Sequence, residues 1–229
     1  ENPSVQNPKQ IVVKGFVKIT LSVINNIQFF QLHGLRLKIR EAIVESCENP
    51  KISTRINKDD ITYDTTLETF TFPFDQSDDS VKQLFSSFPT KINVNIWYSP
   101  TIDNTGDRNG LFERVYLSSH LNRFVYQYAS QLEPCNPRQL FPCFDQPATK
   151  SKFIIEIVAA DFQQAISNMP VVSITEEQVK IRSLHASSEI SVSAEIDPPN
   201  DDLPQVTDLV VLTEAVVTKK RTLFAKTPL

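Results

Sequence analysis

The residue types that most often perform catalysis are few in this sequence, and their spacing does not suit it. The three histidines, His33, His120 and His185, lie far apart, and none begins an H-E-x-x-H pair that would place two zinc ligands on one helical face. With only four glycines, the sequence also has neither a G-x-S-x-G nucleophile turn nor a glycine-rich phosphate loop. We therefore expect no catalytic metal and no catalytic residue in this chain, and a packed structural role for His33.

One stretch, residues 131–152, concentrates residues that suit a rigid binding loop. It reads QLEPCNPRQLFPCFDQPATKSK and holds four of the fifteen prolines and two of the three cysteines, together with Glu133, Arg138 and Asp145. Because proline fixes φ and removes a backbone donor, this density excludes a regular helix or a central strand. Ordered loops on a β scaffold often carry binding residues, so we expect function to reside here.

The remaining sequence predicts the scaffold that must position this loop. Apolar and polar residues alternate in several segments, as in a half-buried strand; the lone Trp97 falls in one of them and is expected in the core. Residues 153–158 are apolar nearly throughout, which predicts a strand covered on both faces. Strands are expected within 15–23, 29–32, 35–40, 61–74, 91–98, 153–158, 179–182, 189–196 and 209–217, and short helices at 81–88 and 159–168. This pattern predicts an all-β fold, a sheet or sandwich with one or two short helices.

The composition of the chain limits the classes of partner that we expect it to bind. The chain has 229 residues and a net charge of −4 without a block of basic residues, so we expect no nucleic-acid partner. No run of about 18 apolar residues and no cleavable leader occur, so we expect a soluble piece without direct membrane contact. Cys47, Cys135 and Cys143 form no C-x-x-C pair, which disfavours a disulfide framework or zinc knuckle. Cys135 and Cys143 could pair, although buried thiols are the favoured interpretation.

The loop sequence EPCNPRQLFPCFDQPATKSKFIIEI resembles the N-terminal domain of the gluzincin zinc aminopeptidases, the group of aminopeptidase N, puromycin-sensitive aminopeptidase and leukotriene A hydrolase. The family pattern is approximately T-Q-x-E-P-x-x-A-R-x-x-F-P-C-F-D-E-P-x-x-K-A-x-F. The matching positions are Gln131, Glu133, Pro134, Arg138, Phe141, Pro142, Cys143, Phe144, Asp145, Pro147, Lys150 and Phe153. Similar phrases elsewhere, from GFVKITLSV at Gly15 to FAKTPL at the end, extend the resemblance along nearly the whole chain.

The resemblance implies a saddle-like, largely antiparallel β domain that covers residues 1–229 and packs against its own catalytic domain. In the family that second domain binds the zinc, and its H-E-x-x-H and G-x-M-E-N motifs are absent here. By residue-wise comparison, Glu133 matches the glutamate that binds the free α-amino group of a peptide substrate, and Gln131 matches the glutamine of the first side-chain pocket. The resemblance assigns Arg138 and Asp145 to holding the loop together and Cys143 to the core.

Three departures leave two interpretations open. Ser130, Pro137 and Gln146 replace the usual threonine, alanine and glutamate, and such relaxation occurs in family members that have lost the zinc site. The parent protein is therefore either an active aminopeptidase or a zinc-less adhesion or scaffold protein; retention of Gln131 and Glu133 favours the first. The absence of N-x-[ST] sequons and the odd cysteine count favour a cytosolic protein, whereas the divergence favours a membrane-anchored ectodomain, to which we lean.

Overall fold

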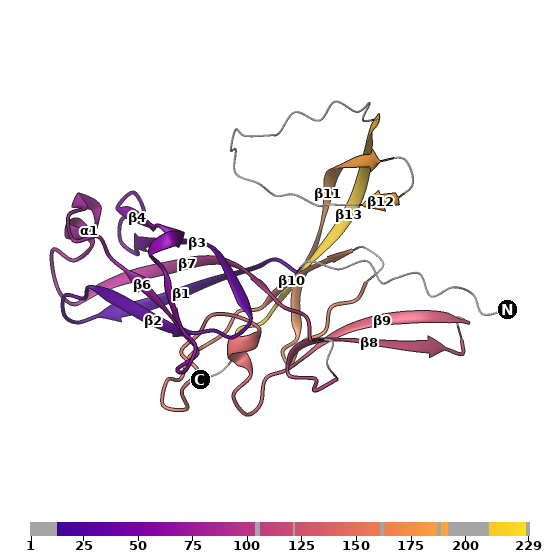
Figure 1. Cartoon of the computed structure of the whole chain (residues 1–229), viewed down its shortest axis with the longest axis horizontal. Coiled ribbons are helices and arrows are strands. Elements are labelled where there is room, and N and C mark those ends of the chain that lie inside the picture. Colours follow the sequence, from indigo (N-terminus) through magenta and orange to yellow (C-terminus); the bar gives the residue numbers. More distant parts are fainter. Residues whose placement is uncertain are drawn as a thin grey trace. The chain divides into compact units, whose positions relative to one another are not determined.

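The computed structural model describes residues 13–103, 106–120, 122–160, 163–186, 189–191 and 211–227, with side chains described outside 178–218. The chain divides into two compact units, Glu1–Thr149 and Lys150–Leu229, which are shown in Figure 1 and treated separately below. The expectation that residues 1–229 form a single domain stays a prediction.

The first unit is built around an antiparallel sheet of four strands in the order β1-β7-β3-β4. These strands are β1 (Gly15–Val23), β7 (Thr90–Pro100), β3 (Leu37–Ser46) and β4 (Ser53–Ile56). The alternation seen in the sequence directs Ile92, Val94 and Ile96 of β7 into the core, where all three are fully buried. Because a shift of one residue would move these side chains to the other face, the apolar pattern fixes the register.

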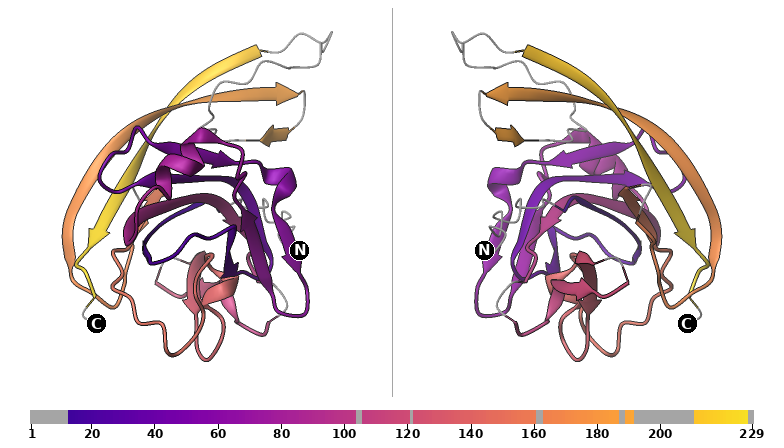
Figure 2. Two further views of the ribbon diagram at one scale, coloured as in Figure 1. Left: turned by 90° about the vertical axis from the view of Figure 1, so that its left-hand side faces the viewer. Right: turned by 90° about the vertical axis from the view of Figure 1, so that its right-hand side faces the viewer.

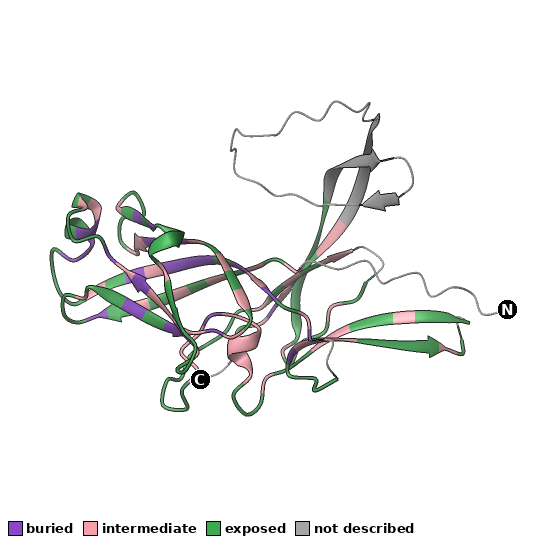
Figure 3. Ribbon diagram, viewed as in Figure 1, coloured by how far each residue is buried: buried purple, intermediate pink, exposed green. Residues whose placement is uncertain are grey.

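A smaller antiparallel sheet in the order β2-β6-β5 supplies the other side of the core. It consists of β2 (Phe29–His33), β6 (Thr69–Pro73) and β5 (Thr62–Asp64). Phe30 stacks on Phe72 with ring centroids 4.7 Å apart, and both belong to the same buried cluster as Val44 of β3. Figure 3 shows buried residues gathered on these strands, so the two sheets form a sandwich.

Two short helical segments flank the sandwich. The 3-10 turn η1 (Lys58–Asp60) follows β4, and the helix α1 (Asp79–Leu84) precedes β7. Asp78 caps α1, because its side chain accepts hydrogen bonds from the amide of Ser80 at 2.8 Å and the hydroxyl of Thr54 at 2.7 Å. The cap ties α1 to β4, and Val81 and Leu84 are buried in the core cluster.

A long hairpin leaves the sandwich and ends at the proline-rich loop. It pairs β8 (Gly110–Ser118) with β9 (Arg123–Gln131) from Gly110↔Gln131 to Ser118↔Arg123. Several large apolar side chains of the hairpin are exposed: Val115, Tyr116, Leu117, Phe124 and Tyr126. The pairing of Gly110 with Gln131 places the first predicted site residue at the base of the hairpin.

The second unit is a four-stranded antiparallel sheet in the order β10-β13-β11-β12. Its strands are β10 (Glu156–Ala160), β13 (Val211–Phe224), β11 (Val171–Ala186) and β12 (Glu189–Ser191). The backbones of β11 and β13 pair from Val171↔Phe224 to His185↔Val211, and Figure 2 shows both strands curving along their length. No helix in the part of the chain that the structure describes is long and apolar enough to cross a membrane.

The all-β fold class is confirmed, but three local predictions are wrong. The helix expected at 159–168 does not form, because β10 continues to Ala160, which pairs with Lys219, and residues 163–167 are not helical. The strand expected at 153–158 begins only at Glu156, and Phe153 and Ile154 are exposed. Trp97 is 37% exposed and packs beside Phe16 at 4.9 Å, since its place in the register turns it away from the core.

Two further expectations fall partly or wholly outside the described residues. Of the strand expected at 189–196, residues 189–191 form β12 and the remainder is not described. Residues 1–10 are polar and contain prolines, which predicts a loop or an irregular start, and they lie outside the description as well. By contrast, the strands expected at 179–182 and 209–217 lie mostly within the longer β11 and β13.

Candidate functional site

The proline-rich segment, residues 132–149, here called the signature loop, is fastened to the sandwich by its backbone. The amide of His33 donates to the carbonyl of Cys143 at 2.8 Å, and the amide of Cys143 donates back to the carbonyl of His33 at 3.1 Å. The amide of Leu35 donates to the carbonyl of Arg138 at 2.7 Å. The prolines prevent this segment from pairing as a regular strand. Its backbone groups instead bond to individual residues of and near β2, so the loop is ordered without regular secondary structure.

A partly buried guanidinium organises the middle of the signature loop. The side chain of Arg138 is only 16% exposed; its Nε donates to Oδ2 of Asp145 at 2.7 Å and its Nη1 to Oε2 of Glu68 at 2.9 Å. Burial alone would lower the pKa of Arg138, but the hydrogen bonds to Asp145 and Glu68 outweigh it and raise the pKa. The charged form of Arg138 therefore links two carboxylates that are 70 and 7 residues away along the chain.

His33 and Cys143 complete the attachment of the loop to β2. The amide of Asp145 donates to Nδ1 of His33 at 3.2 Å, so the neutral imidazole carries its proton on Nε2. Burial, with a further contribution from Asp145, raises the pKa of the Cys143 thiol to about 12. Cys143 therefore stays a neutral thiol at physiological pH, and Phe144 beside it packs against the core cluster.

Cys47, Cys135 and Cys143 are all free, so Cys135 and Cys143 do not pair. Cys47 and Cys143 are only half-buried, and the expectation of a buried thiol is wrong for Cys135, which is exposed. Its position explains this: it lies in the turn between Pro134 and the 3-10 segment η2 (Pro137–Gln139), outside the apolar cluster.

The two predicted substrate-binding residues lie where β9 runs into the signature loop. Gln131 is the last residue of β9, Glu133 follows two residues later, and both are exposed. Within the described residues, neither side chain makes a hydrogen bond or ion pair to the protein, in contrast to Asp145 and Glu68. A carboxylate and a carboxamide are thus both available to a ligand at one end of the loop.

The base of the hairpin is packed tightly against η2. Gly110 has φ +65°, a left-handed conformation that favours glycine, and a Cβ added there would lie 2.5 Å from Cβ of Gln139. A side chain at position 110 would therefore push η2 away from the strand that pairs with Gln131.

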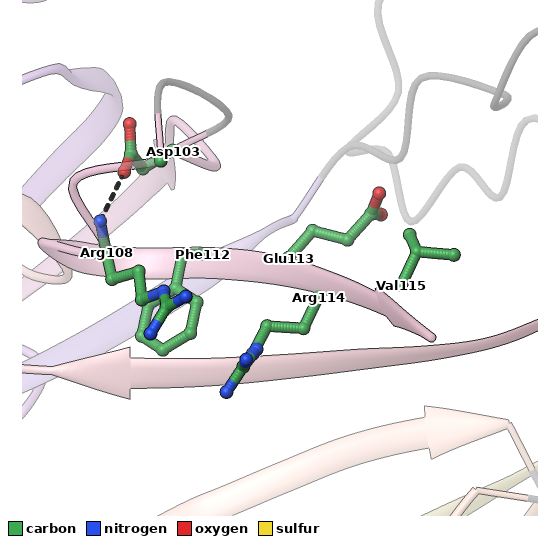
Figure 4. Close-up of a pocket in the computed structure, with 7 residues that line it drawn as sticks. Asp103, Arg108, Phe112, Glu113, Arg114 and Val115 are labelled. Carbon is green, nitrogen blue, oxygen red and sulfur yellow. Dashed lines mark hydrogen bonds between the residues drawn. The ribbon is translucent and has the colours of Figure 1, made fainter. Parts of the chain in front are cut away.

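A separate polar pocket of about 300 Å³ lies along β8 and contains none of the predicted site residues. In Figure 4, Phe112 and Arg114 lie on one side of β8, and Glu113 and Val115 on the other. The two carboxylates of this pocket already accept hydrogen bonds from the protein. Asp103 accepts from the amide of Arg108 at 3.0 Å, and Glu113 accepts from the hydroxyl of Tyr128 at 2.6 Å. Burial, together with that bond, raises the pKa of Tyr128.

Among the residues that the structure describes, no group of three or more histidine, cysteine, aspartate or glutamate side chains could hold a metal ion. The candidate site itself offers the exposed carboxylate of Glu133 and the exposed carboxamide of Gln131, which can take part in hydrogen bonding and charge pairing. Sequence reasoning missed Glu68, the second carboxylate bound to Arg138, because its turn carries no motif; its positive φ of 53° is a property of the folded chain.

Comparison with known proteins gives the same family as the resemblance seen in the loop sequence. A family model described as the Peptidase M1 N-terminal domain matches residues 5–192. Aminopeptidase 2 of Candida albicans is 29% identical over 159 residues, which are 68% of this chain and 14% of that protein. Endoplasmic reticulum aminopeptidase 2 of Bos taurus is 29% identical over 182 residues, 77% of this chain and 17% of that protein. Aminopeptidase Q of Homo sapiens is 42% identical over 71 residues, 31% of this chain and 7% of that protein. The chain thus matches less than a fifth of the length of each relative.

Proposed function

The chain belongs to the Peptidase M1 N-terminal domain family, and we propose that it forms the part of a longer aminopeptidase that helps to recognise the free N-terminus of a peptide substrate. In this proposal Glu133 binds the α-ammonium group, and Gln131 lines the pocket for the first side chain. The partner within the protein is its own catalytic domain, which would hold the zinc; zinc there would polarise the scissile carbonyl and activate water.

One observation carries the proposal. Glu133 is exposed and its carboxylate has no partner among the described residues, whereas Asp145 and Glu68 of the same region are both bound to Arg138. A carboxylate that is not used for stability can accept charge-assisted hydrogen bonds from an ammonium group. An acetylated or otherwise blocked N-terminus lacks that charge, so the contact would select peptides with a free amino group.

Gln131 adds a neutral group two residues from this carboxylate. Its backbone is fixed by pairing with Gly110, so its carboxamide is supplied from an ordered strand end rather than from a free loop. A side-chain amide both donates and accepts hydrogen bonds, and it would shape the first pocket without adding charge that competes with Glu133 for the ammonium group.

The test is the hydrolysis of aminoacyl reporter substrates by the full-length protein, with zinc measured in the same sample. Glu133→Ala should lower kcat/KM roughly tenfold to a hundredfold, because a hydrogen bond to a charged group is worth about 1.5–3 kcal/mol. Glu48→Ala, which removes another exposed loop carboxylate of the first unit, is the matched control and should leave the kinetics unchanged.

The alternative is a zinc-less relative that acts as an adhesion or scaffold protein. It is supported by Gln146, which places a neutral side chain where the family usually has a glutamate. Absence of both zinc and turnover from the full-length protein would favour this alternative and contradict the proposed recognition role of Glu133.

A further inference from the structure

The side chain of Asn136 behaves unlike that of an ordinary helix-capping asparagine. It occupies the N-cap position of η2 but makes no capping hydrogen bond. An N-cap asparagine usually accepts a hydrogen bond from an amide in the first helical turn. Asn57 does so at η1, where its Oδ1 accepts from the amide of Asp59 at 3.2 Å. The side chain of Asn136 therefore makes other hydrogen bonds in place of the capping bond.

Its side chain makes three hydrogen bonds, two within the signature loop and one to Asn109, which lies just before β8. Nδ2 of Asn136 donates to the carbonyl of Glu133 at 2.9 Å and to Oδ1 of Asn109 at 3.2 Å. Its Oδ1 accepts from Nε2 of Gln139 at 2.9 Å. Both donor positions of the amide and its acceptor oxygen are thus used, and the backbone amide of Asn136 is bound to Leu132 at 2.9 Å.

The segments that Asn136 joins are those that carry the two proposed recognition residues. Asn109 directly precedes Gly110, which pairs with Gln131 at the base of the hairpin. Glu133 is held on the other side by its carbonyl. One amide group thus bonds both to the main chain of Glu133 and to the residue that precedes the strand partner of Gln131.

We propose that Asn136 is a positioning residue, which holds the main chain at Glu133 against the base of the β8–β9 hairpin and so fixes the separation of Glu133 and Gln131. This inference rests on the proposed function of those two residues. Recognition groups must be held within a fraction of an ångström of their productive geometry. The side chain of Glu133 makes no hydrogen bond or ion pair within the described residues, so its position depends on the backbone that Asn136 anchors.

The first test uses this chain alone and measures amide hydrogen exchange. Asn136→Ala should accelerate exchange at the amides of residues 132, 133, 135 and 136, above all at that of residue 136, which donates to the carbonyl of Leu132 at 2.9 Å, because the amide bridge that orders this turn is lost. Asn57→Ala is the matched control: it removes an asparagine from the other 3-10 segment and should leave exchange at 132–136 unchanged. Equal exchange in Asn136→Ala and the wild-type chain would overturn the positioning role.

Asn136→Asp tests the two donor positions of the Asn136 side chain separately from its acceptor oxygen. Aspartate can still accept from Gln139, but its carboxylate would face the carbonyl of Glu133 and Oδ1 of Asn109 without a proton to donate. We expect it to accelerate exchange at least as much as Asn136→Ala. Full protection in the aspartate variant would contradict the role given to Nδ2.

The second test is a double-mutant cycle in the full-length protein with a free-N-terminus substrate. Asn136→Ala should lower kcat/KM about threefold to tenfold in the wild-type background and have no effect in the Glu133→Ala background, because it acts through Glu133. Additive losses would overturn positioning while leaving the proposed function intact. An unimpaired Glu133→Ala single variant would instead overturn the proposed function, and with it the inference that rests on it.

Discussion

The sandwich core and the signature loop lie next to each other in the first unit but are held by different forces. The core consists of apolar side chains from both sheets, with Phe72, Val44 and Ile92 fully buried. The signature loop is held by backbone hydrogen bonds to β2 and by the ion pairs of Arg138. Apolar burial is non-directional, whereas hydrogen bonds, including the charge-assisted ones of Arg138, fix orientation. The core therefore supplies stability, and the loop supplies the geometry of the candidate site.

The largest expected effect comes from emptying the core. Phe72→Ala should destabilise the chain by about 3–5 kcal/mol, since it removes a fully buried ring that stacks on Phe30. Urea denaturation measures the loss, and Phe16→Ala is the control, because Phe16 is 52% exposed on the outer face of β1. Equal losses in the two variants would show that the apolar cluster is not the main source of stability.

A smaller effect is expected when the loop loses its guanidinium. Arg138→Ala should cost about 2–3 kcal/mol, because it leaves Asp145 and Glu68 without their charged donor. Arg138→Lys should recover only part of this, since an ammonium group cannot reproduce the planar fork. Arg55→Ala, which removes a largely exposed partner of Glu41, should change the free energy of unfolding by less than about 1 kcal/mol.

Beyond stability, the Arg138 network should also govern the order of the loop. Hydrogen exchange at residues 138–145 should accelerate in Arg138→Ala while exchange in β7 changes little. If exchange in β7 rose equally, the loop and the core would be one cooperative unit, and the contrast between them would fail.

Alkaline pH offers a third effect, at the border of loop and core. The folded-state pKa of Cys143 is raised to about 12 from an ordinary value of 9.0. Below pH 9 the thiol is protonated in both states, so its contribution is fully present; between about pH 9 and 12 the unfolded chain loses the proton first, and stability falls. Cys143→Ala should flatten this part of the stability profile, measured by urea denaturation at each pH.

Alkylation compares the two cysteines of the loop directly. Cys135 is exposed, whereas the raised pKa of Cys143 keeps its thiolate fraction very low at pH 8. Iodoacetamide should therefore modify Cys135 first, with the order read by mass spectrometry of the peptides that contain each cysteine. Rapid modification of Cys143 under native conditions would show that the loop opens away from β2.

Sequence alone predicted those parts of the molecule in which a local pattern decides the structure. Alternation predicted β1 and β7, and proline density predicted that the signature loop is irregular. The helix expected at 159–168 failed because pairing of β10 with β13, more than 50 residues away, overrode the local pattern. The prediction for Trp97 fails because hydrophobicity alone does not place a residue: in β7 the alternating Ile92, Val94 and Ile96 take the buried face and leave Trp97 on the other.

In the candidate site, too, the local motif is predictable from sequence and the long-range contacts are not. The motif located Gln131, Glu133, Arg138 and Asp145 on one segment, but the contacts that order this segment come from elsewhere in the chain. Glu68 reaches Arg138 from a turn 70 residues away, and Asn109 reaches Asn136 from 27 residues away. Neither residue belongs to a recognisable motif, so only the folded chain reveals their part in the site.

The most direct test of the central claim, that the loop presents Glu133 to a free α-amino group, is the selectivity of the full-length protein for unblocked peptides. Inhibition constants would be measured for one peptide with a free and with an acetylated N-terminus, in the wild-type protein and in Glu133→Gln. We predict that the wild-type protein prefers the free peptide at least tenfold, and that Glu133→Gln loses most of this preference by weakening only the free peptide. An unchanged preference in Glu133→Gln would contradict the claim.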